Sequence, residues 1–295
     1  MPGLIAVTGA TGVVGRRVAV LLAERGITQR LVVRDPSRAP TLPGAEVRQI
    51  AGYGAGDDVH AALDGVDTLF LVPGSEAADR RQQHITAVDA AVAAGVRRIV
   101  YLSFVDARPD ATFTLVRDHW ATEERIRASG VAWTFPRMNL YLDFLPFMAA
   151  VVSGEAVIEG PAGDGRAAVV ARADVAEAVA ALLTADDADG RTYDLTGPEA
   201  ITLGEVAERM TEAAGRPVVF RDQTVEAAYA SRAAYGAPDW QVTAWVTTYT
   251  AIATGELAEV SDAVPRLTGR PATSLADYLR GRPGAVRHLT GLTGG

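Results

Sequence analysis

Short runs of apolar and β-branched residues alternate with longer, alanine-rich segments along the first half of the chain. The apolar runs indicate strands that are buried on both faces. The alanine-rich segments indicate helices, and Gly26, Gly95 and Gly130 stand where a left-handed cap would end three of them. The expected strands are residues 4–8, 31–33, 46–50, 68–72, 98–102 and 131–135. The expected helices are residues 12–25, 59–63, 81–94 and 114–129.

This alternation predicts an α/β fold, a Rossmann-type doubly wound parallel sheet with helices on both faces. The rhythm ends after Pro136. We expect a first domain over residues 1–139 that is completed by residues 167–196. Residues 140–166 and 197–295 are expected to form a smaller, mixed α/β C-terminal domain.

Two later segments carry helix-start signals. Asp174 precedes an apolar, alanine-rich run and is expected to cap a helix over residues 175–183. Thr202 and Glu205 have the spacing of a capping box, which predicts a helix from there to about residue 214. Each signal therefore marks the start of a helix in the second half of the chain.

Three glycines at three-residue spacing follow the first expected strand. The stretch "VTGATGVVG" places Gly9, Gly12 and Gly15 between that strand and a helix. In such a turn the first glycine permits the bend, the second lets the backbone approach a pyrophosphate, and the third lets the helix pack closely on the sheet. The helix N-terminus then offers free N–H groups to the phosphates. The pattern predicts a dinucleotide site, and the alternative is a structural turn without a ligand.

The residues after the second strand discriminate between the two nicotinamide cofactors. An acidic residue there holds the ribose 2′-hydroxyl of NAD, whereas an arginine accommodates the 2′-phosphate of NADP. The stretch "VVRDPSR" presents Arg34 and Arg38, while Asp35 can cap the turn beside Pro36. We therefore expect NADP(H) as the cofactor. The alternative is that these arginines only decorate a solvated loop.

Composition excludes several kinds of chemistry. The chain of 295 residues contains neither cysteine nor lysine, so thiol nucleophiles, disulfides, zinc–thiolate sites and lysine Schiff bases are impossible. The net charge of −8 disfavours nucleic acid and anionic membranes as partners. No apolar run approaches the roughly 18 residues of a membrane helix, and the first strand begins too early for a secretory signal. We expect a cytoplasmic protein, a monomer or homodimer, without a metal.

Several longer stretches support one family when they are taken together. They are "VTGATGVVG", "VVRDPSR", "GVDTLFLV", "AAGVRRIVYLS", "ERIRASGVAWTFPRMNLY", "ARADVAEAVAALL" and "GRTYDLTGPEAIT". As a set, over residues 3–280, they resemble the NmrA-like family of atypical short-chain dehydrogenases/reductases, and within it the flavin-free NAD(P)H:quinone reductases. The resemblance implies a Rossmann domain, a small C-terminal substrate domain and a site in the cleft between them. That place agrees with the rule that ligands bind beyond the carboxyl ends of parallel strands.

The resemblance also implies roles for single residues. The glycine turn would hold the pyrophosphate, the two arginines the 2′-phosphate, and the ends of the fourth to sixth strands the nicotinamide. The implied cofactor-binding residues are Gly9, Thr11, Gly12, Val13, Val14, Arg34, Arg38, Val72, Pro73, Ser103, Phe104 and Pro136. One departure lies at Gly52, where relatives often carry an aspartate near the adenine.

A larger departure concerns the catalytic groups. Typical short-chain dehydrogenases use a Tyr-x-x-x-Lys pair, and this chain has no lysine. His119, in the stretch "VRDHWATEERIRASG", stands where related reductases place that lysine. It is the catalytic candidate, because a histidine there could hold the nicotinamide ribose or donate a proton to the reduced substrate. The alternative is a surface histidine paired with Glu123 one turn on. The other histidines, His60, His84 and His288, form no pattern.

Aromatic and apolar residues after the sixth strand suit a flat substrate such as a quinone or an enone. The substrate-binding candidates are Gly74, Asn139, Tyr141, Phe144 and Met148. The aromatic residues could equally pack the domain junction or a dimer surface. The sequence favours an NADPH-dependent oxidoreductase that transfers a hydride to a quinone-like or conjugated carbonyl compound. One alternative is a non-catalytic NAD(P)-sensing regulator of the NmrA type, which would need no apolar cleft at the nicotinamide. Another is a biosynthetic enzyme with a different reaction on this fold.

Overall fold

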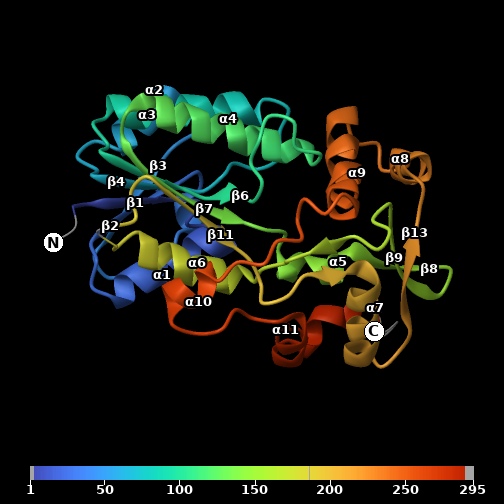
Figure 1. Ribbon diagram of the computed structural model, residues 1–295. Coiled ribbons are helices and arrows are strands. Elements are labelled where there is room, and N and C mark those ends of the chain that lie inside the picture. The colour runs from blue at the N-terminus through green and yellow to red at the C-terminus, as the bar shows by residue number, and fades with distance from the viewer. Residues whose placement is uncertain (1–2, 186, 290–295) are drawn as a thin grey trace.

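A parallel sheet of eight strands forms the centre of the computed structural model, which describes residues 3–185 and 187–289 (Figure 1). Its strands are β1 (Ile5–Thr8), β2 (Gln29–Val33), β3 (Ala45–Gln49), β4 (Thr68–Leu71), β5 (Arg98–Tyr101), β6 (Ser103–Phe104), β7 (Ala132–Met138) and β11 (Arg191–Leu195). The strand order is β3-β2-β1-β4-β5-β7-β11, with β6 beside β7. From β1 the chain adds β2 and β3 on one side, and then crosses back to add β4, β5 and β7 on the other side. The strand order therefore reverses between β1 and β4, and this place is the topological switch point of the sheet.

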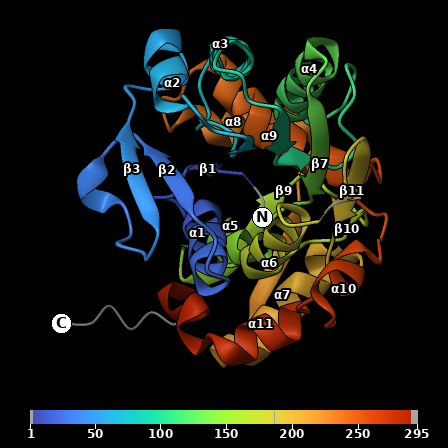
Figure 2. The same ribbon diagram turned by 90° about the vertical axis from the view of Figure 1, so that its left-hand side faces the viewer.

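Helices cover both faces of this sheet, as Figures 1 and 2 show. One face carries α2 (Gly56–Ala62), α3 (Arg80–Ala93) and α4 (Thr114–Ser129). The other face carries α1 (Val13–Glu24) and α6 (Arg172–Leu182). β1 and β4 are buried along their whole length because apolar side chains of both helix layers pack on them. The predicted doubly wound α/β fold is confirmed.

The later part of the chain lies mainly beyond the carboxyl ends of the strands (Figure 1). A small sheet there joins β8 (Ala149–Val152), β9 (Glu155–Gly160) and β13 (Val218–Asp222), and a short ladder joins β10 (Arg166–Ala167) and β12 (Ile201–Thr202). The remaining helices are η1 (Pro36–Arg38), η2 (Leu142–Phe144), α5 (Leu145–Met148), α7 (Leu203–Ala214), α8 (Val225–Ala233), α9 (Asp239–Ala253), α10 (Ala263–Thr268), α11 (Leu275–Gly281) and η3 (Pro283–Leu289). The predicted capping box of Thr202 and Glu205 opens α7. No helix within the described residues is long and apolar enough to cross a membrane.

Pro136 lies inside a strand, whereas we expected it to end one. β7 continues through it to Met138, and Tyr193 of β11 is its partner on one side. On the other side β7 pairs with β5 up to Thr134 and with β6 from Arg137 onward. The proline, which has no N–H to donate, therefore occupies the break between two neighbouring strands.

Asp174 has a different role from the predicted helix cap. α6 begins earlier, at Arg172, and Asp174 lies fully buried within its first turn. Its carboxylate accepts hydrogen bonds from the backbone N–H of Thr273 (2.6 Å) and from the Thr273 hydroxyl (3.0 Å). Nη2 of Arg270 donates to it over 2.7 Å. An aspartate before an apolar run gives the same sequence signal whether it caps its own helix or holds a distant segment.

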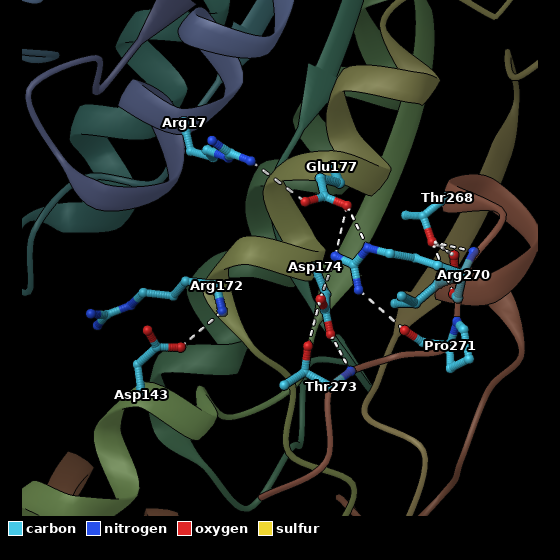
Figure 3. Close-up of polar contacts among 10 residues, drawn as sticks. Arg17, Asp143, Arg172, Asp174, Glu177, Thr268, Arg270, Pro271 and Thr273 are labelled. Atoms are coloured by element: carbon cyan, nitrogen blue, oxygen red, sulfur yellow. Dashed lines mark hydrogen bonds and ion pairs between the residues drawn. The ribbon is translucent and has the colours of Figure 1, made fainter. Parts of the chain in front are cut away.

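These contacts belong to a row of charged side chains that joins α1, α6 and the segment after α10 (Figure 3). Arg17 of α1 lies 3.7 Å from the Glu177 carboxylate of α6, which also pairs with Arg270 at 2.7 Å. Figure 3 shows the Arg270 side chain reaching toward both Glu177 and Asp174. The segment after α10 is thereby tied to the helix layer that also contains the dinucleotide-turn helix.

We expect Asp174→Asn to lower the free energy of unfolding by about 2–4 kcal/mol, because it breaks a buried ion pair and replaces acceptor oxygens. Urea unfolding monitored by circular dichroism measures the change. Asp262→Asn is the matched control, since that side chain is 74% exposed and its partner Arg266 lies 3.6 Å away. The control should change stability by less than about 0.5 kcal/mol. Equal effects of the two substitutions would contradict the role of Asp174.

Candidate functional site

The turn between β1 and α1 is tight. Gly9 has a φ of +62°, and the Gly12 N–H donates to the Gly9 carbonyl over 2.8 Å. A Cβ atom at Gly15 would lie 2.4 Å from that carbonyl oxygen, so the helix can pack there only without a side chain. The first N–H groups of α1 have no acceptor within the helix, which leaves a helix N-terminus able to bind an anion. The predicted pyrophosphate residues lie together in this turn: Gly9, Thr11, Gly12, Val13 and Val14.

The loop after β4 forms a wall beside this turn. A Cβ atom on Gly9 would lie 3.0 Å from the Cβ of Val72. The Val72 N–H donates to the Thr8 hydroxyl (2.8 Å), and the Tyr53 hydroxyl donates to the Val72 carbonyl (2.6 Å). Burial raises the pKa of Tyr53 to about 12, so this hydroxyl stays a neutral donor. Turn and loop meet at the switch point between β1 and β4, where open α/β sheets bind their ligands.

Two arginines follow β2 at the edge of the turn. Arg34 and Arg38 are both exposed, and the backbone carbonyl of Arg38 accepts a 2.6 Å hydrogen bond from Arg16 of α1. Asp35 is occupied, because its carboxylate accepts from the N–H (3.0 Å) and the hydroxyl (2.6 Å) of Ser37. These hydrogen bonds hold the pKa of Asp35 below its ordinary value. Asp35 therefore caps η1, while Arg34 and Arg38 are exposed on either side of it.

Polar side chains of β6 and of the carboxyl end of β7 are hydrogen-bonded within the protein. The Ser103 hydroxyl donates to the buried Glu123 carboxylate over 2.6 Å, and Arg137 donates to both oxygens of the same carboxylate (2.8 and 2.7 Å). The Asn139 amide donates to the Leu257 carbonyl over 3.0 Å. These residues fix the carboxyl ends of β6 and β7 and join them to the segment after α9.

His119 is buried, with 3% of its surface exposed, so it is not the surface histidine of the alternative interpretation. Its Nδ1 lies 2.9 Å from the Tyr101 hydroxyl, and its Nε2 lies 3.1 Å from Nη2 of Arg80. Because a guanidinium can only donate, Nε2 is the accepting nitrogen and Nδ1 carries the hydrogen. Burial, followed by the charge of Arg80, holds the pKa of His119 well below its ordinary value. The ring is therefore a neutral imidazole, with the Phe104 ring 6.0 Å away.

A second buried histidine, His84 of α3, lies beside this group. Its Nε2 accepts a hydrogen bond from the Gly74 N–H (2.9 Å), and its Nδ1 lies 3.0 Å from the Thr122 hydroxyl. Burial, followed by the charge of Arg80, lowers the pKa of His84 to about 3. Sequence reasoning missed this residue, although its helical spacing from the buried Val88 could have placed it on the inner face of α3.

A cavity of about 200 Å³ opens where β6, β7 and β11 end. Its lining residues are Val105, Asp106, Arg137, Asn139, Asp194, Glu256, Leu257 and Glu259. Burial raises the pKa of Asp106 and that of Asp194. Of the predicted substrate residues, Asn139 lines this cavity. The sequence analysis missed the charged residues of this cavity; Asp194 lies near the carboxyl end of β11, where site residues are typical.

The other predicted substrate residues lie outside the lining of this cavity. The Arg172 guanidinium stacks over the Tyr141 ring at 4.7 Å. Phe144 is 55% exposed, and Met148 is half-buried. Gly74 belongs to the wall after β4 and faces His84. The structure therefore spreads the five candidates over more than one surface, and their role in substrate binding stays a prediction.

Comparison with known proteins places residues 9–186 in the NAD(P)H-binding family model. An NAD(P)H azoreductase of Xenophilus azovorans is 31% identical over 96% of this chain and 99% of its own length. A (4-alkanoyl-5-oxo-2,5-dihydrofuran-3-yl)methyl phosphate reductase of Streptomyces griseus is 37% identical over 93% of this chain and 96% of its own.

Solved structures similar to this chain include further NADP(H)-binding reductases. An NADPH-dependent quinone oxidoreductase of Escherichia coli, crystallised with NADPH, superposes with a TM-score of 0.84 at 31% identity, over 94% of this chain and 99% of its own. A Citrobacter triphenylmethane reductase, crystallised with NADP(H), has a TM-score of 0.83 at 30% identity over the same shares. The negative transcriptional regulator NmrA has a TM-score of 0.78 at 17% identity over 99% of both chains, a likeness of fold alone.

We expect stability to fall as the pH drops below about 6.5, because unfolded histidine binds a proton there while His84 in the folded protein does not until about pH 3. Between about pH 6.5 and pH 3, each unit by which the pH falls lowers the free energy of unfolding by about 1.4 kcal/mol through His84. Urea unfolding between pH 4 and 7 measures the slope, and His84→Gln should reduce it by about one proton. His60→Gln, at an exposed histidine, is the control for the substitution of a histidine by glutamine. A His84→Gln slope equal to that of the wild type would refute the buried neutral state.

Proposed function

We propose, since the chain belongs to the NAD(P)H-binding family and within it to the NmrA-like atypical short-chain dehydrogenases/reductases, that it is an NADPH-dependent reductase of flat, aromatic, quinone-like compounds. The observation that carries the proposal is the free helix N-terminus at Gly12 beside the Val72–Gly74 loop, at the switch point of the sheet. Relatives named for quinone, azo and dye reduction support the acceptor class.

The residues present fit NADPH. The turn leaves space above Gly12, where a Cβ atom would meet only the Gly9 carbonyl at 3.3 Å, so backbone N–H groups are open to a pyrophosphate. Arg34 and Arg38 would hold the 2′-phosphate, since Asp35 is bound to Ser37 and does not compete for a ribose hydroxyl. The bound cofactor would supply the hydride. The loop after β4 and the Phe104 side of the sheet would orient its nicotinamide end.

The protein's own contribution in this proposal is position and electrostatics. His119 is neutral and its two ring nitrogens are engaged with Tyr101 and Arg80, so it does not act as the acid. The proton would reach the reduced acceptor from water. This is sufficient for a quinone, because the aromatic ring that forms already stabilises the negative charge on its oxygen. The regulatory alternative has less support, since its relative NmrA shares only the fold.

We expect purified protein to consume NADPH in the presence of quinones, azo dyes or triphenylmethane dyes, monitored by the loss of NADPH absorbance. Turnover with at least one of these acceptors, above the rate without acceptor, is the predicted result. Saturable NADPH binding without turnover on any of them would contradict the reductase and favour a sensor.

We expect Arg34→Ala to raise the KM for NADPH about tenfold or more and to leave the KM for NADH nearly unchanged, because the lost charge-assisted contact involves only the 2′-phosphate. Steady-state kinetics with both cofactors measures the ratio. Arg97→Ala is the matched control: this exposed arginine directly precedes β5, at the amino end of that strand, and pairs there with Asp67. An equal rise of KM for the two cofactors would show that Arg34 does not read the phosphate.

A further inference from the structure

Side chains of α3 bind both backbone polar groups of Gly74, in the wall after β4. Its N–H donates to Nε2 of His84 over 2.9 Å, and its carbonyl accepts from Nε of Arg80 over 3.0 Å. Arg80 and His84 stand one helical turn apart, and both are buried. Helix α3 thus fixes the two peptide units that flank the Gly74 Cα atom.

Behind these two residues lies a polar group that is buried between α3, α4 and β5. Nη2 of Arg80 lies 3.1 Å from Nε2 of His119, whose Nδ1 lies 2.9 Å from the Tyr101 hydroxyl. Nδ1 of His84 lies 3.0 Å from the Thr122 hydroxyl, which donates to the Asp118 carbonyl of the preceding turn over 2.7 Å. These buried residues are connected to the loop through the two hydrogen bonds that His84 and Arg80 make with Gly74.

The hydrogen-bond directions in this group follow from its donors. The Gly74 N–H can only donate, so Nε2 of His84 accepts and Nδ1–H donates to Thr122. Protonating His84 would set an N–H against the Gly74 N–H, and the depressed pKa of His84 agrees with a neutral ring. Both histidines thus have one fixed tautomer, and the group has a single arrangement.

Packing a helix on this sheet does not require such a group. Apolar side chains fill the same layer at neighbouring positions, such as Val88 of α3 and Ile126 of α4. Burying an arginine and two imidazoles is less favourable than burying aliphatic side chains of that size, unless their geometry has a use. The arrangement has a use at the loop, where its contacts determine the position of the Gly74 backbone in the wall of the site.

The same loop is also held at its other end. Thr8 and Tyr53 bind the N–H and the carbonyl of Val72, so side chains satisfy all four of these backbone groups at Val72 and Gly74. We propose that Arg80 and His84 are positioning residues, which keep the Val72–Gly74 wall in the shape that receives the nicotinamide half of the cofactor. This inference rests on the proposed function. A wall that is ordered before binding spares the complex the conformational entropy of ordering it.

The test separates the two halves of the cofactor. Binding of NADPH and of adenosine 2′,5′-bisphosphate, which lacks the nicotinamide half, is measured by calorimetry for the wild type and variants. His84→Leu should weaken NADPH about tenfold and leave the bisphosphate unchanged, because only the wall is disturbed. His84→Gln retains an acceptor for the Gly74 N–H and should recover most of the affinity. His60→Leu, at an exposed histidine, is the control.

A second readout follows the loop itself. Hydrogen exchange of the peptide over residues 72–79 should become faster in His84→Leu and return toward the wild-type rate in His84→Gln. If His84→Leu does not fold, Thr122→Val takes its place, since it removes the hydrogen-bond partner of His84 Nδ1. It should weaken NADPH binding and speed the exchange in the same way, with smaller changes in both. In either variant, unchanged NADPH affinity or an equal loss for both ligands would overturn the positioning role. Wild-type protein that binds neither ligand would instead overturn the proposed function, and the inference with it.

Discussion

The site depends on one steric constraint, which is that two loops approach more closely than side chains would allow. Gly9 takes up a left-handed conformation against Val72, and position 15 has no room for a Cβ atom beside the Gly9 carbonyl. Because of this, β1 turns directly into α1, and the loop after β4 lies against that turn. The free N-terminus of α1 and the Val72–Gly74 wall therefore face the same space at the switch point of the sheet. In the proposed reaction this space holds the cofactor.

Loops packed this closely have backbone groups that neither a strand nor a helix satisfies. In this chain, side chains from distant elements bind them, as His84 binds Gly74 and Asp174 binds Thr273. An unpaired buried donor or acceptor is destabilising by about 1–3 kcal/mol, so each such bond selects one geometry of its loop. Buried polar residues such as His84 and Asn139 bind the backbone of irregular segments beyond the strand ends. They define the shape of the site, whereas the apolar layers around the strands supply most of the stability.

The fold could be predicted because its signals are local. Apolar runs, helix-ending glycines and the glycine turn each depend on residues within a few positions, and the structure has the expected order of strands and helices. The polar group behind the wall could not be predicted in this way, because His84 and Thr122 are 38 residues apart and meet only when α3 and α4 pack. Asp174 was misread because a local signal, aspartate before an apolar run, has two structural solutions. The cavity was missed for a similar reason, since Arg137 and Glu256 come from separate parts of the chain.

The lack of lysine and the neutral state of His119 both remove a side chain that could donate a proton to the reduced substrate. A simple ketone that accepts a hydride becomes an alkoxide, which needs a positioned acid to be formed at a useful rate. Arginine stays charged and does not give up its proton, and the His119 imidazole is engaged with Tyr101 and Arg80. Acceptors whose reduced form is already a delocalised anion need no such acid. In the proposed reaction neither the arginines nor His119 supplies such an acid, which favours quinone-like acceptors over isolated ketones.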